Sequence, residues 1–307
     1  MMHLSCVVPF LIVLRSCLAN TIILQKDIDT VVSLAAKVQV DRNVLVFTAA
    51  YDKELPMYAV QCINSIRLHN ISNAMIISFS DQTYANQVPT ARVDTKPPCK
   101  QREKRRQVGC WRLFYTLELL KAGFNVLQSD LDIVFFSNPF MHLSTQHDVQ
   151  AMSDAVTREI AFGYTVYNSH ANHQSNFGQW EFHVNGLNIG FYYVRSSPQS
   201  IYLYTETTTI LTATGDWEQY VLSHLTISFT LQGVLNLKVL DPVFFQNSGF
   251  MERNGMQEIT PIVIHSSHHA DKQRWLQRAI EKWGKAPATK PDDLFVYNFS
   301  CIHGVHI

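Results

Sequence analysis

Two aspartates one residue apart, Asp130 and Asp132, stand where an apolar segment of the chain ends, in FNVLQSDLDIVFFSNPF. In an extended backbone, residues i and i+2 point to the same side, so we expect both carboxylates to face the same way. Such a pair predicts a site for one hard divalent cation, because Mn²⁺ and Mg²⁺ prefer carboxylate and phosphate oxygens. A cation shared with a diphosphate would neutralise the charge that develops on a departing phosphate group.

The elements around this pair place it at the carboxyl end of a strand. A helix is predicted over Trp111–Ala122, Gly123 is a stop signal, and Phe124–Leu127 has the apolar run of a buried strand. A second buried run, Ile133–Phe136, follows the pair. Open α/β sheets bind ligands at the carboxyl ends of their strands, which favours a binding site here. The alternative is a turn whose aspartates bond only local backbone.

Length and charge limit the possible classes of protein. The chain has 307 residues, a formal net charge of zero and 16% charged residues. This length suits one large α/β domain or two small ones, and the neutral charge argues against extensive nucleic-acid binding. The local exception is the basic run KQREKRR over 100–106. We interpret it as a solvated loop beside an anion site or as a processing-like basic run.

The N-terminal segment indicates the secretory route. An apolar run over Leu4–Leu14 precedes Arg15, and small residues end at Ala19. The run is shorter than the ~20 residues of a membrane span. We therefore expect 1–19 to be a cleaved signal peptide, with a membrane-anchoring signal as the alternative, and 20–42 to be a short stem. The second aspartate pair, Asp27-Ile28-Asp29, is interpreted as solvated carboxylates of this stem.

Cysteines and glycosylation sequons fit the same route. Without the leader, the remaining cysteines are Cys62, Cys99, Cys110 and Cys301. Four cysteines allow three pairings, and buried free thiols are equally compatible with the sequence. The sequons Asn70-Ile-Ser72 and Asn298-Phe-Ser300 are consistent with a lumenal chain.

The body of the chain has the alternation of an α/β sheet. Strands are predicted over Val44–Ala49, Ala74–Phe79, Leu187–Val194, Val234–Leu240 and Ile262–His265, and sheet with loop over Asp148–Tyr167. Helices are predicted over Pro56–Leu68, Ile201–Leu211, Trp217–Thr226 and Lys272–Trp283.

The order of several short segments resembles a known family. The segments FTAAYD, GFNVLQSDLDIVFFSNPF, NIGFYYVR, DWEQYVLS and VIHSSHHADK, spread over Val44 to Trp283, resemble the nucleotide-diphospho-sugar transferase family, which holds plant and algal xylosyl- and arabinosyltransferases of glycosyltransferase family 77. The resemblance implies a GT-A fold over 43–307, with a mostly parallel central sheet flanked by helices. It also implies a UDP-sugar donor, Mn²⁺ dependence and retention of anomeric configuration. We further expect a carbohydrate or glycoprotein acceptor and, from the N-terminal segment, a location in the Golgi lumen or elsewhere on the secretory route.

The resemblance assigns a metal site. Asp130 corresponds to the first aspartate of the family motif, expected near the donor ribose and sugar and the cation, and Asp132 to the second, a direct ligand. His265, at the end of a predicted strand, suits a third ligand, and imidazole is more natural for Mn²⁺ than for Mg²⁺. The alternative is that His265 belongs with His268 and His269 to a surface group.

Donor-binding residues are predicted on both sides of this site. Lys272 and Arg112 would pair with the diphosphate, or would be solvated charges. Ala49 and Tyr51, at the end of the first strand, would lie against the nucleotide base, or at the edge of the core.

Catalytic and sugar-binding roles are predicted for three further positions. Asn188 would bond sugar hydroxyls where Gly190 lets backbone approach a ligand, or the two would form a strand-entry turn. Glu218 and Gln219 match an Asp-Gln pair of the family, and the carboxylate would steady positive charge on the sugar or act as nucleophile. Glutamate replaces the family's aspartate here, and Ser223 replaces an expected asparagine.

Taken with the resemblance, these residues predict metal-assisted transfer of a pentose or galactose from a UDP-sugar to a carbohydrate hydroxyl. Two other functions are compatible with the sequence. One is a metal-dependent phosphohydrolase with a two-metal site built from acidic residues, His265, His268, His269 and Asp271. The other is a glycan- or nucleotide-binding relative that keeps the pocket without turnover.

Overall fold

A computed structural model of the chain describes residues 24–50, 55–80, 88–94, 104–158, 161, 165–168, 180–183, 186–255, 259–267 and 269–284. The expected leader, Tyr51, Cys99, His268, Cys301 and the second sequon lie outside these residues.

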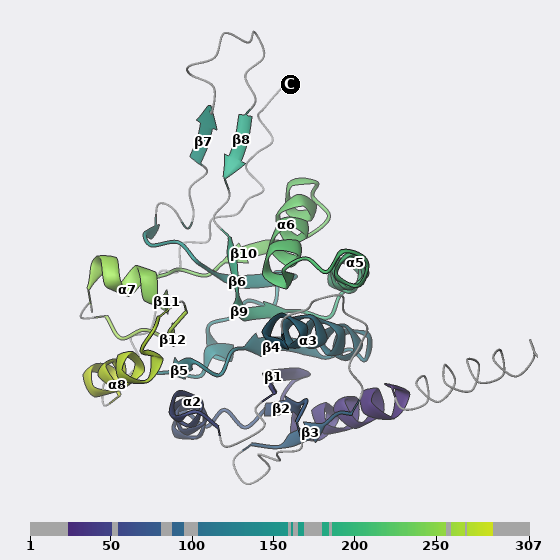
Figure 1. Ribbon diagram of the computed structural model, residues 1–307, viewed down its shortest axis with the longest axis horizontal. Helices are drawn as coiled ribbons and strands as arrows, with labels where there is room; N and C mark the ends of the chain where they lie inside the picture. The colour runs from purple at the N-terminus through teal and green to yellow at the C-terminus, as the bar shows by residue number, and fades with distance from the viewer. Residues whose placement is uncertain are drawn as a thin grey trace, which may run out of the picture.

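A seven-stranded sheet forms the centre of the molecule, in the order β10-β6-β9-β4-β1-β2-β3 (Figure 1). Its neighbours pair in parallel except at β9, which is antiparallel to both β4 and β6. The strands are β1 (Asn43–Ala49), β2 (Ala74–Ser78), β3 (Thr90–Arg92), β4 (Asn125–Ser129), β6 (Val149–Ser153), β9 (Leu187–Val194) and β10 (Leu237–Val239). The prediction of a mostly parallel α/β sheet is confirmed.

Helices cover both faces of this sheet (Figure 1). On one face lie α3 (Lys104–Lys121), α5 (Pro198–Thr214) and α6 (Glu218–Leu231), and on the other α2 (Met57–Leu68), α7 (Ser248–Asn254) and α8 (Lys272–Trp283). Alternate residues of a strand point to opposite faces. In β1, Val44 and Val46 accordingly pack in the core beneath α3 and α5, whereas Leu45 and Phe47 pack in the core beneath α2.

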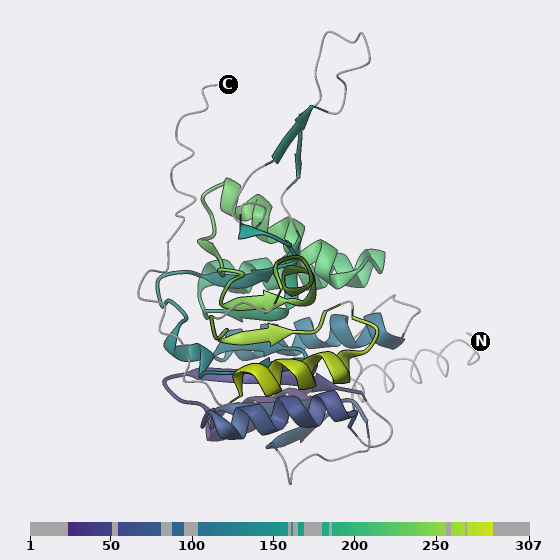
Figure 2. The same cartoon turned by 90° about the vertical axis from the view of Figure 1, so that its left-hand side faces the viewer.

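A smaller sheet lies beside the main one and carries part of the site. It has the order β11-β12-β5, with β5 (Ile133–Phe135), β11 (Phe245–Asn247) and β12 (Val263–His265). Figure 2 shows β11 and β12 above α8, which packs Trp275 and Leu276 against β5 and β12. The strands β7 (Thr165–Asn168) and β8 (Trp180–His183) form a separate antiparallel pair.

A helix over 24–38 precedes the sheet and packs on it. Val31 and Ala35 of this helix are fully buried in the core that also holds α3. Asp27 is 4% exposed and accepts a hydrogen bond from the Asp94 backbone N–H at 3.0 Å. The prediction that Asp27 is solvated is therefore wrong, because the helix turns this residue towards the sheet edge. Asp29 is exposed.

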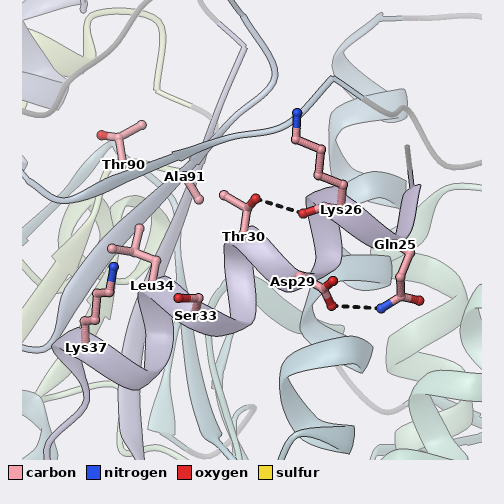
Figure 3. Close-up of a pocket in the computed structure, with 9 residues that line it drawn as sticks. All are labelled: Gln25, Lys26, Asp29, Thr30, Ser33, Leu34, Lys37, Thr90 and Ala91. Atoms are coloured by element: carbon pink, nitrogen blue, oxygen red, sulfur yellow. Dashed lines mark hydrogen bonds between the residues drawn. The ribbon is translucent and has the colours of Figure 1, made fainter. Parts of the chain in front are cut away.

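A shallow cavity of about 730 Å³ lies between this helix and β3, lined by Gln25, Lys26, Asp29, Thr30, Ser33, Leu34, Lys37, Thr90 and Ala91 (Figure 3). It contains none of the predicted site residues. Of the helices in the described ranges, none combines the length and the apolar composition that crossing a bilayer requires.

The basic run at 100–106 was expected to form a loop, but its last three residues, Lys104–Arg106, begin α3. Lysine and arginine are good helix formers, so the helix extends about two turns before the predicted start at Trp111. Among the described cysteines, Cys62 is a buried free thiol, and Cys110 is disulfide-bonded to a partner outside the described residues.

Candidate functional site

Asp130 and Asp132 lie in the short turn between β4 and β5, at the carboxyl end of β4. The Asp130 backbone N–H donates to the Gly190 carbonyl at 2.8 Å. The Asp132 carbonyl accepts from the Ser266 backbone N–H at 3.0 Å and from its hydroxyl at 3.1 Å. The turn is thus held from one side by β9 and from the other by the loop after β12.

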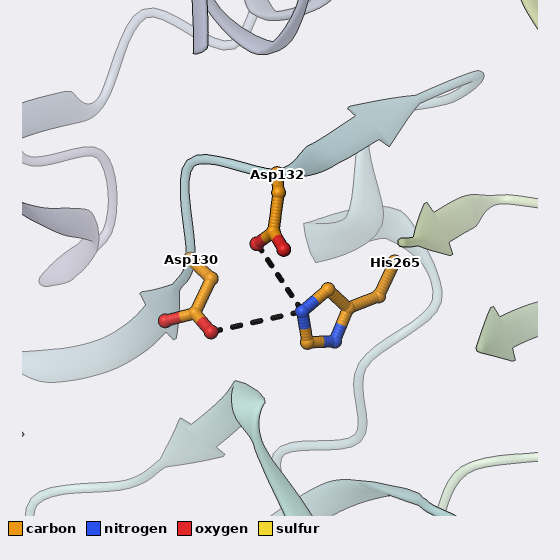
Figure 4. Close-up of side chains that lie close together, drawn as sticks. All are labelled: Asp130, Asp132 and His265. Carbon is orange, nitrogen blue, oxygen red and sulfur yellow. Dashed lines mark ion pairs between the residues drawn. The ribbon is translucent and has the colours of Figure 1, made fainter. Parts of the chain in front are cut away.

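His265, the last residue of β12, brings its ring to both carboxylates (Figure 4). Its Nε2 lies 3.2 Å from Asp132 Oδ1 and 3.6 Å from Asp130 Oδ2. One ligand atom from each of the three residues falls within 4.8 Å of the others. His265 is 3% exposed, so it is not one of a surface group of histidines.

The other ring nitrogen of His265 fixes the orientation of the imidazole. Nδ1 lies 3.1 Å from the side-chain oxygen of Asn188, which also accepts the Gly190 backbone N–H at 2.8 Å. An amide oxygen accepts only, so Nδ1 carries a proton and donates, and Nε2 faces the carboxylates. Such an outer partner is what holds a metal-binding histidine in one tautomer.

Two basic residues compensate the carboxylates. Lys272, at the start of α8, donates to Asp132 Oδ2, and Arg112 of α3 donates from Nη1 to Asp130 Oδ1 at 2.6 Å. The Arg112 side chain is 7% exposed, so its charge is largely removed from water. Neither residue is the freely solvated charge that was the alternative, and both place positive charge where an anionic ligand would meet the aspartates.

The pKa values of His265 and Asp132 move in opposite directions. Burial lowers the pKa of His265, but the carboxylates of Asp132, Asp130 and Asp154 raise it, and the result lies above its ordinary value. Burial raises the pKa of Asp132, whereas His265 and Lys272 lower it, and the result lies well below its ordinary value. These shifts favour the charged form of each residue, because the protonated imidazole and the carboxylate stabilise each other.

Gly190 leaves the space that this cluster needs. A Cβ at this position would lie 2.2 Å from His265 Cε1, 2.8 Å from Asp130 Oδ2 and 2.9 Å from the Asn188 side-chain oxygen. Real Cβ atoms do not approach so closely. Gly190 is therefore required by the packing of the site, and the strand-entry turn does not account for it, because it lies inside β9.

Asp154, which was not predicted from the sequence, joins two of the predicted residues. Its Oδ1 accepts from the Asn188 side-chain amide at 2.6 Å, and its Oδ2 accepts from Gln219 at 2.8 Å. Asp154 directly follows β6 at the carboxyl end of that strand. Asp130 was predicted because it is an acidic residue directly after a strand, and Asp154 has the same position after β6.

Glu218 and Gln219 begin α6 and face inwards. Glu218 is 9% exposed, and a Cβ on Gly109 of α3 would lie 2.2 Å from its Oε1. Ser223, in place of the expected asparagine, is buried and donates to the Leu187 carbonyl at 3.2 Å. The amino end of α6 is thus fixed against both α3 and β9.

The remaining predicted positions that the structure describes have other partners. Ala49 is buried at the end of β1, where its carbonyl accepts the Phe79 backbone N–H at 2.8 Å, and Tyr51 lies outside the described residues. His269 lies 3.5 Å from Glu252, and Asp271 caps α8 by accepting the Arg274 backbone N–H at 3.1 Å. Among the described residues, these groups do not form the second metal site that a two-metal phosphohydrolase needs.

The donor set fits one divalent cation. Two carboxylates and a histidine whose Nε2 faces them are acceptable to Mn²⁺, and the mixed oxygen and nitrogen donors are less natural for Mg²⁺. Asp130 is the most accessible of the three, with 39% of its side chain exposed, whereas the side chains of Asp132 and His265 are 8% and 4% exposed. The cluster is therefore open on the Asp130 side.

Comparison with known proteins found a matching family and similar plant proteins. The model of the nucleotide-diphospho-sugar transferase family matches residues 77–278. Two proteins of Arabidopsis thaliana, Arabinosyltransferase RRA1 and Arabinosyltransferase RRA2, are 29% and 26% identical to the chain over 271 and 272 residues. Each match covers 81% of this chain but 65% and 61% of the relatives, so the chain spans less than two thirds of their length.

Among solved structures, the bifunctional glycosyltransferase WbbM in its apo form aligns with a TM-score of 0.50 at 15% identity. The alignment covers 81% of this chain and 50% of that one. At this level of identity the likeness concerns the fold, and it agrees with the predicted GT-A-type arrangement.

Proposed function

Because the chain belongs to the nucleotide-diphospho-sugar transferase family, we propose that it transfers a sugar from a UDP-sugar to a hydroxyl of a carbohydrate or glycoprotein. The observation that carries this proposal is the convergence of Asp130, Asp132 and His265 at the carboxyl end of β4, with Lys272 and Arg112 bonded to the carboxylates. Acidic ligands beside fixed positive charge are what a metal-bound diphosphate requires.

The donor diphosphate binds at this cluster. Asp130, Asp132 and His265 hold the cation, Mn²⁺ in preference to Mg²⁺, which when bound stabilises negative charge on the diphosphate oxygens. Lys272 and Arg112 add positive charge on the protein side. When the bond between the sugar and the diphosphate breaks, these two side chains stabilise the negative charge of the leaving UDP.

The transferred sugar lies against Asn188 and Gln219. Asn188 is fixed by His265 and Asp154, and Gln219 by Asp154, so neither amide has to be ordered when a sugar binds. Glu218 supplies a buried carboxylate at the start of α6, where it steadies positive charge on the sugar. The acceptor hydroxyl attacks the sugar from the face that the diphosphate leaves, so the configuration of the anomeric carbon is retained. The proton of that hydroxyl passes to the released phosphate oxygen.

The donor sugar is a pentose, and arabinose is our first choice because both Arabidopsis relatives bear the name arabinosyltransferase. Xylose and galactose are the alternatives to be tested. The protein works in the Golgi lumen or elsewhere on the secretory route, a proposal supported by the apolar leader at 1–19 and the two sequons.

The direct test is a donor screen. Purified chain is incubated with Mn²⁺ and UDP-arabinose, UDP-xylose or UDP-galactose, with and without a mixture of neutral oligosaccharides, and UDP and products are measured by mass spectrometry. We expect UDP release that depends on acceptor and is lost with EDTA. Phosphate or nucleoside monophosphate released without acceptor would indicate a hydrolase instead. Binding of UDP and Mn²⁺ without product from any donor would indicate an inactive relative.

A further inference from the structure

Trp217 and Tyr220 are exposed aromatic side chains at the start of α6. Their exposed fractions are 43% and 56%, and together with Tyr202 on α5 they are the strongly exposed aromatic side chains in the part of the chain that the structure describes. Large apolar side chains that gather on a surface mark a binding site, because their area is removed from water only when a partner covers it.

The position of Trp217 relates it to the candidate site. It immediately precedes Glu218 and Gln219, and Gln219 donates to Asp154 at 2.8 Å. Asp154 accepts from Asn188 at 2.6 Å, and Asn188 contacts His265 at 3.1 Å. An unbroken hydrogen-bonded path thus leads from the metal-binding cluster to the residue two places after Trp217.

The two aromatic residues lie at the amino end of α6. Trp217 is the residue that precedes the helix, and Tyr220 lies in its first turn. The rings of Tyr220 and His224 are 4.1 Å apart between centroids. The opposite face of α6 buries Leu222 and Thr226 in the core. Tyr220 and His224 are therefore directed to solvent, and the exposed Trp217 stands just before them at the end of the helix that reaches the site; these three residues are called the aromatic stripe.

The type of side chain changes in a fixed order along this path. Positive charge and metal ligands come first, at Lys272, Arg112 and the cluster, then the amides of Asn188 and Gln219, and then the aromatic stripe. A nucleotide sugar bound in this order has its diphosphate at the cluster and its sugar at the amides. The reacting hydroxyl of the acceptor meets the sugar on the face of the diphosphate, and the rest of the acceptor extends from there past the amides to the aromatic end.

We propose that Trp217 and Tyr220 form the acceptor subsite, which stacks against a neutral sugar ring of a carbohydrate acceptor. Aromatic side chains offer a large rigid area to the C–H face of a sugar at low cost in conformational entropy. His224 beside Tyr220 provides hydrogen bonds for hydroxyl groups, whereas a wholly apolar stripe would suit a second copy of the chain. This inference deepens the proposed function and rests on it.

The test compares variants that keep the fold. Trp217 makes no side-chain capping bond to α6, so Trp217→Ala leaves the helix start intact. Trp217→Ala, Tyr220→Ala and the conservative Trp217→Phe are compared with Tyr202→Ala, which removes an exposed tyrosine that stacks on Phe229 at 5.3 Å instead. Binding of arabinobiose, xylobiose and galactobiose to the full chain with UDP and Mn²⁺ is measured by isothermal titration calorimetry.

We expect Trp217→Ala and Tyr220→Ala to weaken binding of the preferred disaccharide about tenfold, and Trp217→Phe and Tyr202→Ala to retain it. The thermal shift with UDP and Mn²⁺ should be the same in all five proteins. If wild type shows that shift but none of the disaccharides binds, or Trp217→Ala binds like wild type, the acceptor subsite is overturned. Loss of a dimer in Trp217→Ala would also overturn it, in favour of a second copy. Absence of the UDP shift in wild type would instead contradict the proposed function.

Discussion

His265 has different partners on its two ring nitrogens, and this difference prepares it to bind a metal. Nδ1 lies against the Asn188 oxygen, and Nε2 lies 3.2 Å from Asp132. In the metal-free chain the neighbouring carboxylates raise the pKa of His265 and so favour a proton on Nε2. A metal ligand must be the neutral imidazole, so cation and proton compete for the same nitrogen.

This competition predicts opposite effects of pH on two properties: the stability of the metal-free chain and its affinity for Mn²⁺. The raised pKa of His265 stabilises the metal-free fold below about pH 6.5, and this contribution is lost as the pH rises through the folded-state pKa. The lowered pKa of Asp132 contributes above about pH 3.9 and is lost as the pH falls through its folded-state value. Affinity for Mn²⁺ should therefore rise from pH 6 to pH 8 by roughly tenfold or less per pH unit for a single proton.

The proton released when Mn²⁺ binds can be counted by calorimetry in buffers of different ionisation enthalpy, because the measured heat then changes with the buffer. His265→Gln, which cannot take the proton, should abolish the release. An affinity for Mn²⁺ that does not change with pH would show that His265 is not a ligand.

Gly190 offers a second test at the residue scale. Gly190→Ala would push a methyl group into His265 and Asp130, which should cost about 1–3 kcal/mol of stability and abolish the Mn²⁺-dependent binding of UDP. Gly186→Ala is the matched control, because a Cβ there meets nothing within 4 Å. Thermal unfolding with and without Mn²⁺ and UDP checks both variants. Normal UDP binding by Gly190→Ala would show that the space beside His265 is not needed.

Among the secondary-structure elements, those with an apolar pattern were predictable, including the short strands β5, β10 and β12, whereas β3, β11 and α7 were not. The strand over Leu187–Val194 and the helix over Lys272–Trp283 have the predicted bounds, because eight buried residues and an amphipathic repeat are clear signals. The three-residue strands β3 and β11 show no period that a sequence pattern can reveal. The helix α7, of seven residues, is similarly short.

The same limit applies to the candidate site. Asp130 and Asp132 could be found because they are neighbours in sequence and follow an apolar run. Asp154 bonds residues that are 34 and 65 positions away, so its role depends on tertiary pairing. The contact of Gly109 with Glu218 depends likewise on how α3 packs against α6.

That contact between α3 and α6 gives a prediction at the scale of elements. In a helix, alanine normally stabilises by about 0.5–1 kcal/mol relative to glycine, but a Cβ on Gly109 would lie within 2.8 Å of Glu218 Cγ, Cδ and Oε1. Gly109→Ala should therefore destabilise by about 1–3 kcal/mol. In a Glu218→Ala background the same change should be neutral or stabilising. Denaturant unfolding of the four proteins gives the coupling energy, and additive effects would contradict the contact.

For the molecule as a whole, the two sheets meet at the site. Asp130 follows β4 of the large sheet, Asp132 precedes β5 and His265 ends β12 of the small one. Cys62 of α2 packs behind this junction, fully buried, where burial and then the charge of Asp132 raise its pKa. The cation site thus exists only when both sheets are assembled.

Labelling of Cys62 should consequently report unfolding of the whole molecule. Without reductant, we expect an alkylating reagent to leave Cys62 unmodified in the native chain and to modify it at the rate of global opening. Mn²⁺ with UDP should slow this rate, because a ligand that binds only the folded state stabilises it, by about 2.7 kcal/mol at about 100 times the dissociation constant. Peptide mass spectrometry measures the rate. Rapid labelling of the native chain would show that α2 is not packed as described.

The measurement closest to the central claim is the thermal shift of Asp132→Asn with UDP and Mn²⁺. Asparagine keeps the size of the side chain but removes the charge that pairs with His265 and Lys272. Asp29→Asn, in the other aspartate pair, is the control, because Asp29 is exposed on the helix over 24–38. We predict that Asp132→Asn folds and loses the Mn²⁺-dependent shift, whereas Asp29→Asn keeps it. A full shift in folded Asp132→Asn would contradict the metal site and the sugar-transfer chemistry built on it.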